Sequence, residues 1–192
     1  MINKILQIFN KNEDGVAAIE AALILPVAIL MFVGIFEVGQ MLLLNQKVYA
    51  ASHMVGDLLT RKTILDNDDM KEAYAAGQMI VDPFQRTGLK LNIAGVKFDK
   101  DQKAVEVWQK SFNTINDTSL YSRADKLGSE NEGAIIVKAS YTYTPVFLNF
   151  KMPFTGSSGS TFSILDMDET TVLRGRVNSC MTYNDSGTLH TC

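Results

Sequence analysis

One apolar run near the N-terminus dominates the hydrophobic pattern of this 192-residue chain. From Ala21 to Phe36 no side chain is charged or polar, and with its flanks the apolar stretch extends from Gly15 to Leu44. About 20 apolar residues suffice to cross a bilayer as a helix. A backbone in lipid must also satisfy its own hydrogen bonds, as a helix does. The run therefore predicts one membrane-spanning helix.

Beyond this run, apolar residues continue at spacings of three and four through Glu37–Lys62. They are Met41, Leu44, Val48, Ala51, Val55 and Leu58. This period indicates that the helix extends out of the membrane. Val16–Lys62 would then form a spine roughly 70 Å long, at about 1.5 Å per residue. We expect the stripe to pack on the chain's own globular domain; packing against sister subunits is the alternative.

A polar break at Thr63–Asp69 precedes a second predicted helix, which ends near Val81 because Pro83 follows. Asp69 and Glu72 have the spacing of a capping box. The acidic residues around this start favour the positive end of the helix dipole. A calcium loop is the alternative for them, but the segment lacks the glycine and the terminal glutamate of an EF-hand loop. The acids concerned are Asp66, Asp68 and Asp69.

From Leu89 onward the hydrophobic period changes to two, which is typical of strands. The predicted strands are Leu89–Phe98, Ala104–Phe112, Ala134–Thr144, Thr161–Leu165 and Thr170–Val177. The first two are expected to form a hairpin or a small meander around a polar turn, and Asn113–Gly133 is expected to be a surface loop with a short helical turn. The predicted fold class is α+β, with a long N-terminal transmembrane and spine helix before a small antiparallel-sheet domain with one packed helix.

Two residues, Glu20 and Pro26, distinguish the predicted span from an ordinary anchor. A carboxylate such as Glu20 costs about 2.5–3.5 kcal/mol at the centre of a bilayer helix and less near the interface. Glu20 therefore either lies near the headgroups or has a partner that neutralises it. Pro26 removes one backbone donor and is expected to kink or loosen the helix. Small residues at a spacing of four let helices approach closely in lipid; they are Ala17 with Ala21 and Ala18 with Ala22.

The order of these N-terminal residues resembles a class III signal of type IV pilins and pseudopilins. A polar lead ends in Gly15, a short apolar stretch and Glu20 follow, and a long apolar helix comes next. GVAAIEAALILP, followed by GIFEVGQMLLLNQKVYAASHMVGDLL, is similar to the TadE-like pseudopilins of tight-adherence (Flp) pilus systems. Tyr141–Phe147 and Thr170–Val177 also resemble strands of that family. Ala21 stands where the major Flp pilins usually have Tyr, which favours a minor pseudopilin.

The resemblance implies that a prepilin peptidase cuts between Gly15 and Val16. Residues 1–15 would then be the leader, 16–62 the transmembrane and spine helix, and 63–192 an extracytoplasmic α+β domain. The new amine of Val16 and the carboxylate of Glu20 would lie on one helix face, since they are four residues apart. An ammonium of the same or a neighbouring chain would neutralise Glu20.

The resemblance also implies partners and a location. The partners are a prepilin peptidase, the major Flp pilin and other pseudopilins, the inner-membrane pilus assembly platform and the lipid bilayer. The chain would cross the bacterial inner membrane once, with its N-terminus cytoplasmic and its C-terminal domain periplasmic. Its final place is the membrane, the filament or the pilus tip.

The only two cysteines lie in the C-terminal tail, at Cys180 and Cys192. In an oxidising compartment they would form a disulfide, worth about 3 kcal/mol in the chain-entropy model. Two free thiols are the alternative. Thiolate–metal binding is disfavoured, because His190 is the only other plausible ligand nearby and structural zinc takes four.

Charge and motif content narrow the function further. A net charge of −3 and a pI near 5.4 argue against nucleic acid as a partner. His53 and His190 have no nucleophile or metal partner by spacing, and no phosphate-binding glycine loop follows a strand. We therefore expect neither an enzyme nor a cofactor or metal site, and we expect Trp108 and Tyr141/Tyr143 in the core. The expected function is that of a minor pseudopilin that primes or caps a pilus. The alternative is a signal-anchored extracytoplasmic binding or adhesion module that does not polymerise.

Overall fold

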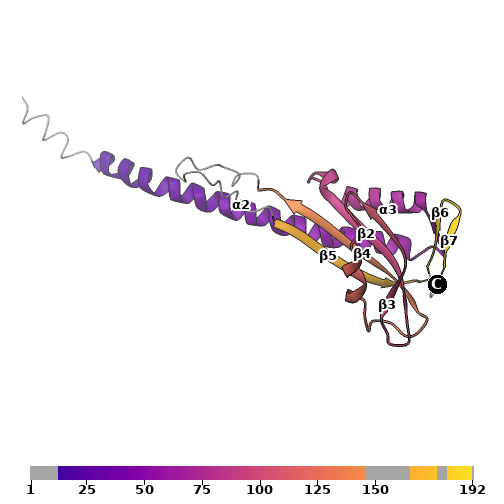
Figure 1. Cartoon of the computed structure of the whole chain (residues 1–192). Coiled ribbons are helices and arrows are strands. Elements are labelled where there is room, and N and C mark those ends of the chain that lie inside the picture. Colours follow the sequence, from indigo (N-terminus) through magenta and orange to yellow (C-terminus); the bar gives the residue numbers. More distant parts are fainter. Residues whose placement is uncertain (1–12, 146–164, 177–180, 192) are drawn as a thin grey trace, which may run out of the picture.

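The longest element of the molecule is a single helix, which extends well beyond the domain attached to it (Figure 1). The computed structural model describes residues 13–145, 165–176 and 181–191. The long helix is α2 (Glu13–Leu59), and α3 (Asn67–Ile80) packs against its C-terminal half. The predicted α+β class, with one long apolar helix and a sheet domain carrying one packed helix, is confirmed.

The main sheet has four antiparallel strands in the order β3-β2-β4-β5. Its strands are β2 (Leu89–Phe98), β3 (Ala104–Phe112), β4 (Gly133–Tyr143) and β5 (Leu165–Arg174). The predicted hairpin is confirmed as β2 and β3, whose register shifts between Gly95 and Val96. The indole of Trp108 occupies the space that a side chain at position 95 would need. The predicted surface loop contains the short helical turn η2 (Thr118–Arg123), and a second turn, η1 (Arg86–Gly88), precedes β2.

Two of the strand predictions require correction at the end of the chain. Thr161–Leu165 and Thr170–Val177 were expected to be separate strands, but Leu165–Arg174 forms one continuous strand, β5, and residues 161–164 lie outside the described residues. A second sheet, in the order β1-β6-β7, was not predicted. Its strands are β1 (Ile64–Asp66), β6 (Thr182–Asp185) and β7 (Thr188–His190), and they are too short and too polar to give a clear period-two signal.

The main core lies between α2, α3 and the inner face of the sheet. Leu44, Val48, Ala51 and Val55 of α2 are fully buried there, so the predicted self-packing of the stripe is confirmed. The sister-subunit alternative is wrong for this stripe. The stripe ends on Leu59, which is buried, instead of the predicted Leu58, because the buried face continues by four residues from Val55.

The start of α3 lies one turn earlier than predicted. Asp66 is the N-cap, and its carboxylate accepts from the backbone N–H groups of Asp68 and Asp69 at 3.0 and 2.8 Å. The capping box therefore joins Asp66 with Asp69, and the predicted Asp69–Glu72 box is wrong. Asp69 also pairs with Lys62. The acids cap the helix, as the dipole interpretation predicted.

The C-terminal hairpin β6–β7 is fixed to the domain by two aromatic side chains. Trp108 Nε1 donates to the carbonyl of Met181 at 2.9 Å, and the hydroxyl of Tyr183 donates to Asn67. Trp108, Tyr141 and Tyr143 are all buried, as predicted. A turn through Ser186 and Gly187 joins the two strands, whereas Cys180 and Cys192, the predicted disulfide, lie outside the described residues.

Candidate functional site

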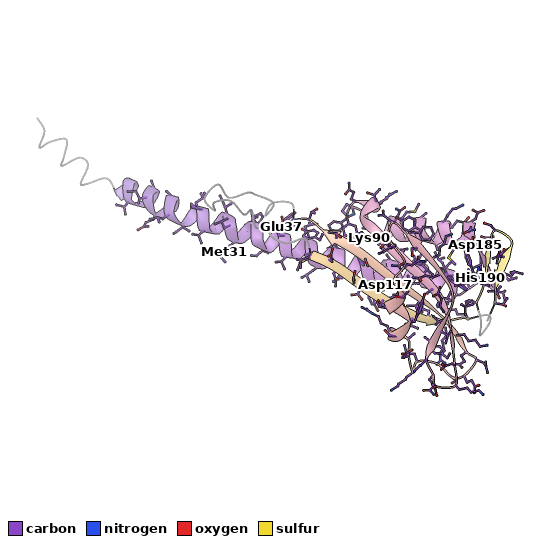
Figure 2. All side chains as sticks on the ribbon, in the orientation of Figure 1. Met31, Glu37, Lys90, Asp117, Asp185 and His190 are labelled. Atoms are coloured by element: carbon purple, nitrogen blue, oxygen red, sulfur yellow. The ribbon has the colours of Figure 1, made fainter. Side chains whose placement is uncertain are left out.

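The described residues leave the N-terminal half of α2 bare on every side. All side chains from residue 15 to residue 32 are exposed, and Met31 lies on the part of the helix just before the strands reach it (Figure 2). The most apolar 18-residue window of the helix has a mean hydropathy of 2.6, and the rest of the described chain buries none of it. Length and composition thus make α2 compatible with a single-pass membrane anchor.

The structure places all the predicted processing and assembly residues on this bare half. Gly15 lies inside the first turn of α2, which begins at Glu13, and nothing approaches within 4 Å of the position where its Cβ would stand. Val16 and Glu20 lie one turn apart and are exposed. The helix continues through Pro26 without a break. The predicted small residues are likewise exposed: Ala17, Ala18, Ala21 and Ala22.

Glu20 has no partner within the described part of the chain. None of the residues in 13–145, 165–176 and 181–191 forms a hydrogen bond or an ion pair with its carboxylate. An ionised carboxylate in an apolar surface favours any cation that reaches it. The helix therefore presents one carboxylate in a long uncharged surface, at the predicted position.

Glu37 is a second carboxylate on the same helix, and the sequence analysis did not single it out. It is only 4% exposed, and it lies where the strands first reach the helix (Figure 2). The hydroxyl of Tyr143, the last residue of β4, donates to Glu37 Oε2 at 2.6 Å. Burial, together with the hydrogen bond to Glu37 and its charge, raises the pKa of Tyr143 to about 12. The available signal was that Glu37 is the first ionisable residue after the apolar run.

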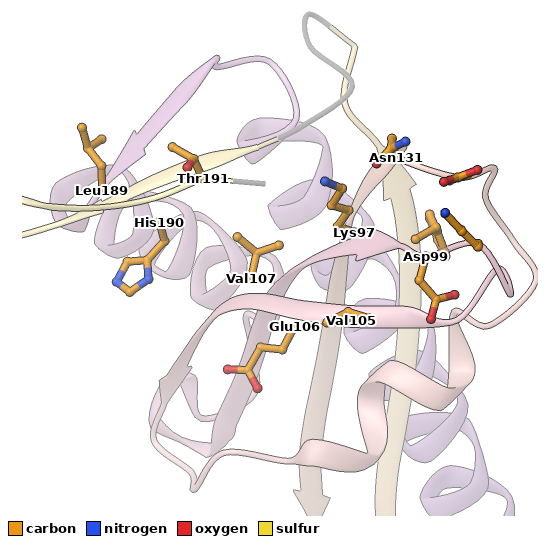
Figure 3. Close-up of a pocket in the computed structure, with 12 residues that line it drawn as sticks. Lys97, Asp99, Val105, Glu106, Val107, Asn131, Leu189, His190 and Thr191 are labelled. Carbon is orange, nitrogen blue, oxygen red and sulfur yellow. The ribbon is translucent and has the colours of Figure 1, made fainter.

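The opposite end of the molecule contains an open groove of about 630 Å³ (Figure 3). It lies between the turn of the β2–β3 hairpin and β7, and its lining mixes cationic Lys97 and Lys100 with the carboxylates of Asp99, Glu106 and Glu130. His190 lines it, whereas His53 lies on α2, where its ring is tilted against that of Tyr49. No group of three His, Cys, Asp or Glu within the described residues is placed to hold a metal ion. The groove favours no particular ligand chemistry.

Comparison with known proteins gives one family match, and it falls on the long helix. Residues 15–56 match the model of a protein family described as TadE-like protein. The matched range covers nearly all of α2, including Gly15, Glu20 and Glu37, and stops before the sheet domain. No curated protein and no solved structure matches the chain. The resemblance drawn from the N-terminal sequence is confirmed, and it links the chain to the tight-adherence pilus system in general terms.

Proposed function

We propose, from a helix that is TadE-like over residues 15–56, that this chain is a minor pseudopilin of a tight-adherence pilus. A prepilin peptidase matures it by cutting between Gly15 and Val16. The mature helix then packs with the helices of the major Flp pilin and other pseudopilins on the inner-membrane assembly platform, where it primes or caps the filament. The observation that carries the proposal is the exposed apolar stretch of α2 over residues 15–32, in which Glu20 is the one carboxylate.

The distance between the two carboxylates supports a role for Glu20 beyond anchoring. Glu20 and Glu37 are separated by about 26 Å along the helix, at about 1.5 Å per residue. The hydrocarbon layer of a typical bilayer is about 30 Å thick, so an upright helix cannot keep both carboxylates outside it unless the bilayer thins. Glu37 accepts a hydrogen bond from Tyr143 of its own domain. Glu20 is the carboxylate that needs an external cation.

Cleavage after Gly15 would create such a cation close to Glu20. The new ammonium of Val16 would lie one helical turn from Glu20, on the same face of α2. The same ammonium on a neighbouring subunit would serve equally well and would draw two helices together.

The experiment that tests this proposal is an intact-mass measurement of the membrane-extracted chain, with and without the cognate prepilin peptidase. We expect a peptidase-dependent loss of mass that matches removal of Met1–Gly15. The variant Gly15→Leu should stay uncleaved in the presence of the peptidase. Gly34→Leu is the matched control, because Gly34 also lies on the bare helix with nothing within 4 Å, and it should be cleaved normally.

The outcome also separates the proposal from the competing function. An uncleaved wild-type chain under both conditions would overturn peptidase maturation. The chain would then be better described as a signal-anchored binding or adhesion module that does not polymerise.

A further inference from the structure

The face of α2 that points away from its own domain carries no ionised side chain over several turns above the apolar run. Between Glu37 and Asp57 the helix contains one Lys and no Arg, Asp or Glu. That residue, Lys47, donates through Nζ to the carbonyl of Ile80 at 3.1 Å, at the end of α3. A helix face that meets only water normally carries charged and polar side chains. The lack of charged side chains on this face is therefore typical of a helix surface that contacts another surface.

Five residues on this face, of which His53 is half-buried and the other four are exposed, have the spacing of a helix-pairing seam. The outward seam consists of Gly39, Leu42, Gln46, Tyr49 and His53, at alternating intervals of three and four. Leu42 is 56% exposed and Tyr49 52%, and the ring of Tyr49 lies 4.3 Å from that of His53. Nothing approaches within 4 Å of a Cβ at Gly39. Alternating intervals of three and four are the pattern of a left-handed two-stranded coiled coil.

The described elements of the domain leave this seam open. The sheet and α3 cover the other side of α2, where Leu44, Val48 and Val55 are buried. Ser52 turns towards β5, where its hydroxyl meets that of Thr171 at 2.9 Å, and Lys47 turns towards α3. A second helix can therefore lie along the outward seam without displacing any described element.

We propose that the outward seam binds the same seam of a second copy of this chain, as a parallel pair above the membrane. Two copies inserted in one bilayer have parallel helices at the same height, so each seam residue faces its own counterpart. Gln46 would then face Gln46 of the second copy, and an amide both donates and accepts, so the pair is self-complementary. A polar residue at a seam position fixes register and oligomeric state. Gly39 lets the two backbones approach closely.

This inference rests on membrane insertion, which the proposed function includes, but it does not depend on assembly into a filament. The test uses the full chain in the membranes of cells that lack the other pilus proteins. A photo-reactive amino acid replaces Tyr49 in one sample. In the matched control it replaces Asn45, which is exposed on the same helix but lies off the seam. We expect a cross-linked product of twice the chain mass of 21.2 kDa from position 49 and none from position 45.

A pair of substitutions at Gln46 tests the seam itself. Gln46→Lys places like charges opposite each other and should reduce the cross-linked dimer by about tenfold or more. Gln46→Leu should retain the dimer, because an apolar residue at this position also pairs. Gln46 is exposed, so neither change should alter the unfolding midpoint of the domain.

Three results would overturn the paired seam: equal cross-linking from positions 45 and 49, a product of another mass, or a Gln46→Lys dimer as abundant as wild type. Peptidase processing and piliation are measured separately. If the dimer is missing but piliation is normal, the paired seam is overturned and the proposed function stands. If the dimer forms but the chain is not processed, only the proposed function is overturned.

Discussion

The two halves of α2 belong to one unbroken helix, yet they differ in how their apolar side chains are buried. From Leu44 to Leu59 one face of the helix is buried by the chain's own sheet and by α3. From Gly15 to Phe32 no face is buried at all, although this half is the more apolar. The C-terminal half contributes to the stability of the domain, whereas the described residues give the N-terminal half no packing partner.

The two carboxylates on the helix show the same division. Glu37 is buried and accepts a hydrogen bond from Tyr143, so the fold itself stabilises its charge. Glu20 lies in the bare half without a partner among the described residues. A charge stabilised within the fold affects folding, whereas a charge left for an external partner affects recognition. Substitutions in the two halves should therefore separate stability from function.

The largest expected difference is in the free energy of unfolding, when the same Leu→Ala truncation is made in each half of α2. Leu44→Ala removes a fully buried side chain and should lower the free energy of unfolding by about 2–5 kcal/mol. Leu30→Ala removes an exposed side chain from the bare half and should change it by less than about 0.5 kcal/mol. Denaturant unfolding in detergent, followed by the fluorescence of the sole tryptophan, Trp108, measures both. Equal losses would mean that the domain also packs against the N-terminal half.

A smaller effect is expected where the two halves meet. Tyr143→Phe removes the hydroxyl that donates to Glu37 and leaves a buried carboxylate with one donor fewer, which should cost about 1–3 kcal/mol. Tyr141→Phe is the matched control, because the buried Tyr141 hydroxyl donates to the neutral backbone carbonyl of Gln85 at 3.1 Å. Its loss should cost about 0.5–1.5 kcal/mol. A Tyr143→Phe variant no less stable than the control would show that Glu37 gains little from its phenol.

The same contact predicts a dependence on alkaline pH. The pKa of Tyr143 is raised to about 12 in the folded chain, whereas a tyrosine in an unfolded chain titrates near pH 10. Its contribution is therefore fully present below about pH 10 and is lost as the pH rises towards about 12, because the unfolded chain releases the proton first. In that window Tyr143→Phe should make the fall in unfolding free energy shallower by up to about 1.4 kcal/mol per pH unit.

Unfolding midpoints recorded at several pH values between about 10 and 12 test that slope. Burial also raises the pKa of Tyr74 and Tyr141, so the wild-type slope contains several protons. The difference between the two chains isolates Tyr143. Identical slopes would contradict the effect of burial and of Glu37 on this phenol.

Local patterns predicted much of this fold, and the failures have physical causes. The uninterrupted apolar run predicted α2, and the period-two pattern predicted the β2–β3 hairpin, because each signal lies within one element. The cap of α3 was placed a turn late because three nearby aspartates can all cap a helix, and the chain entering from β1 selects Asp66. Glu37 was missed because its partner, Tyr143, is 106 residues away in the sequence. Contacts between distant segments leave no periodic signal.

The smallest effect on folding is expected from a substitution of Glu20. This substitution also tests most directly whether the two halves of α2 have separate roles. Glu20→Gln removes the charge but keeps the shape of the side chain, and it should change the free energy of unfolding by less than about 0.5 kcal/mol, because the residue is exposed. Membrane insertion should also persist, since an amide costs less than a carboxylate in lipid. Piliation, counted by electron microscopy beside Asn45→Asp as an exposed control on the same helix, should fall in the Glu20 variant alone. Full piliation by Glu20→Gln would show that assembly does not need the carboxylate, and the bare half would then be an anchor without a recognition charge.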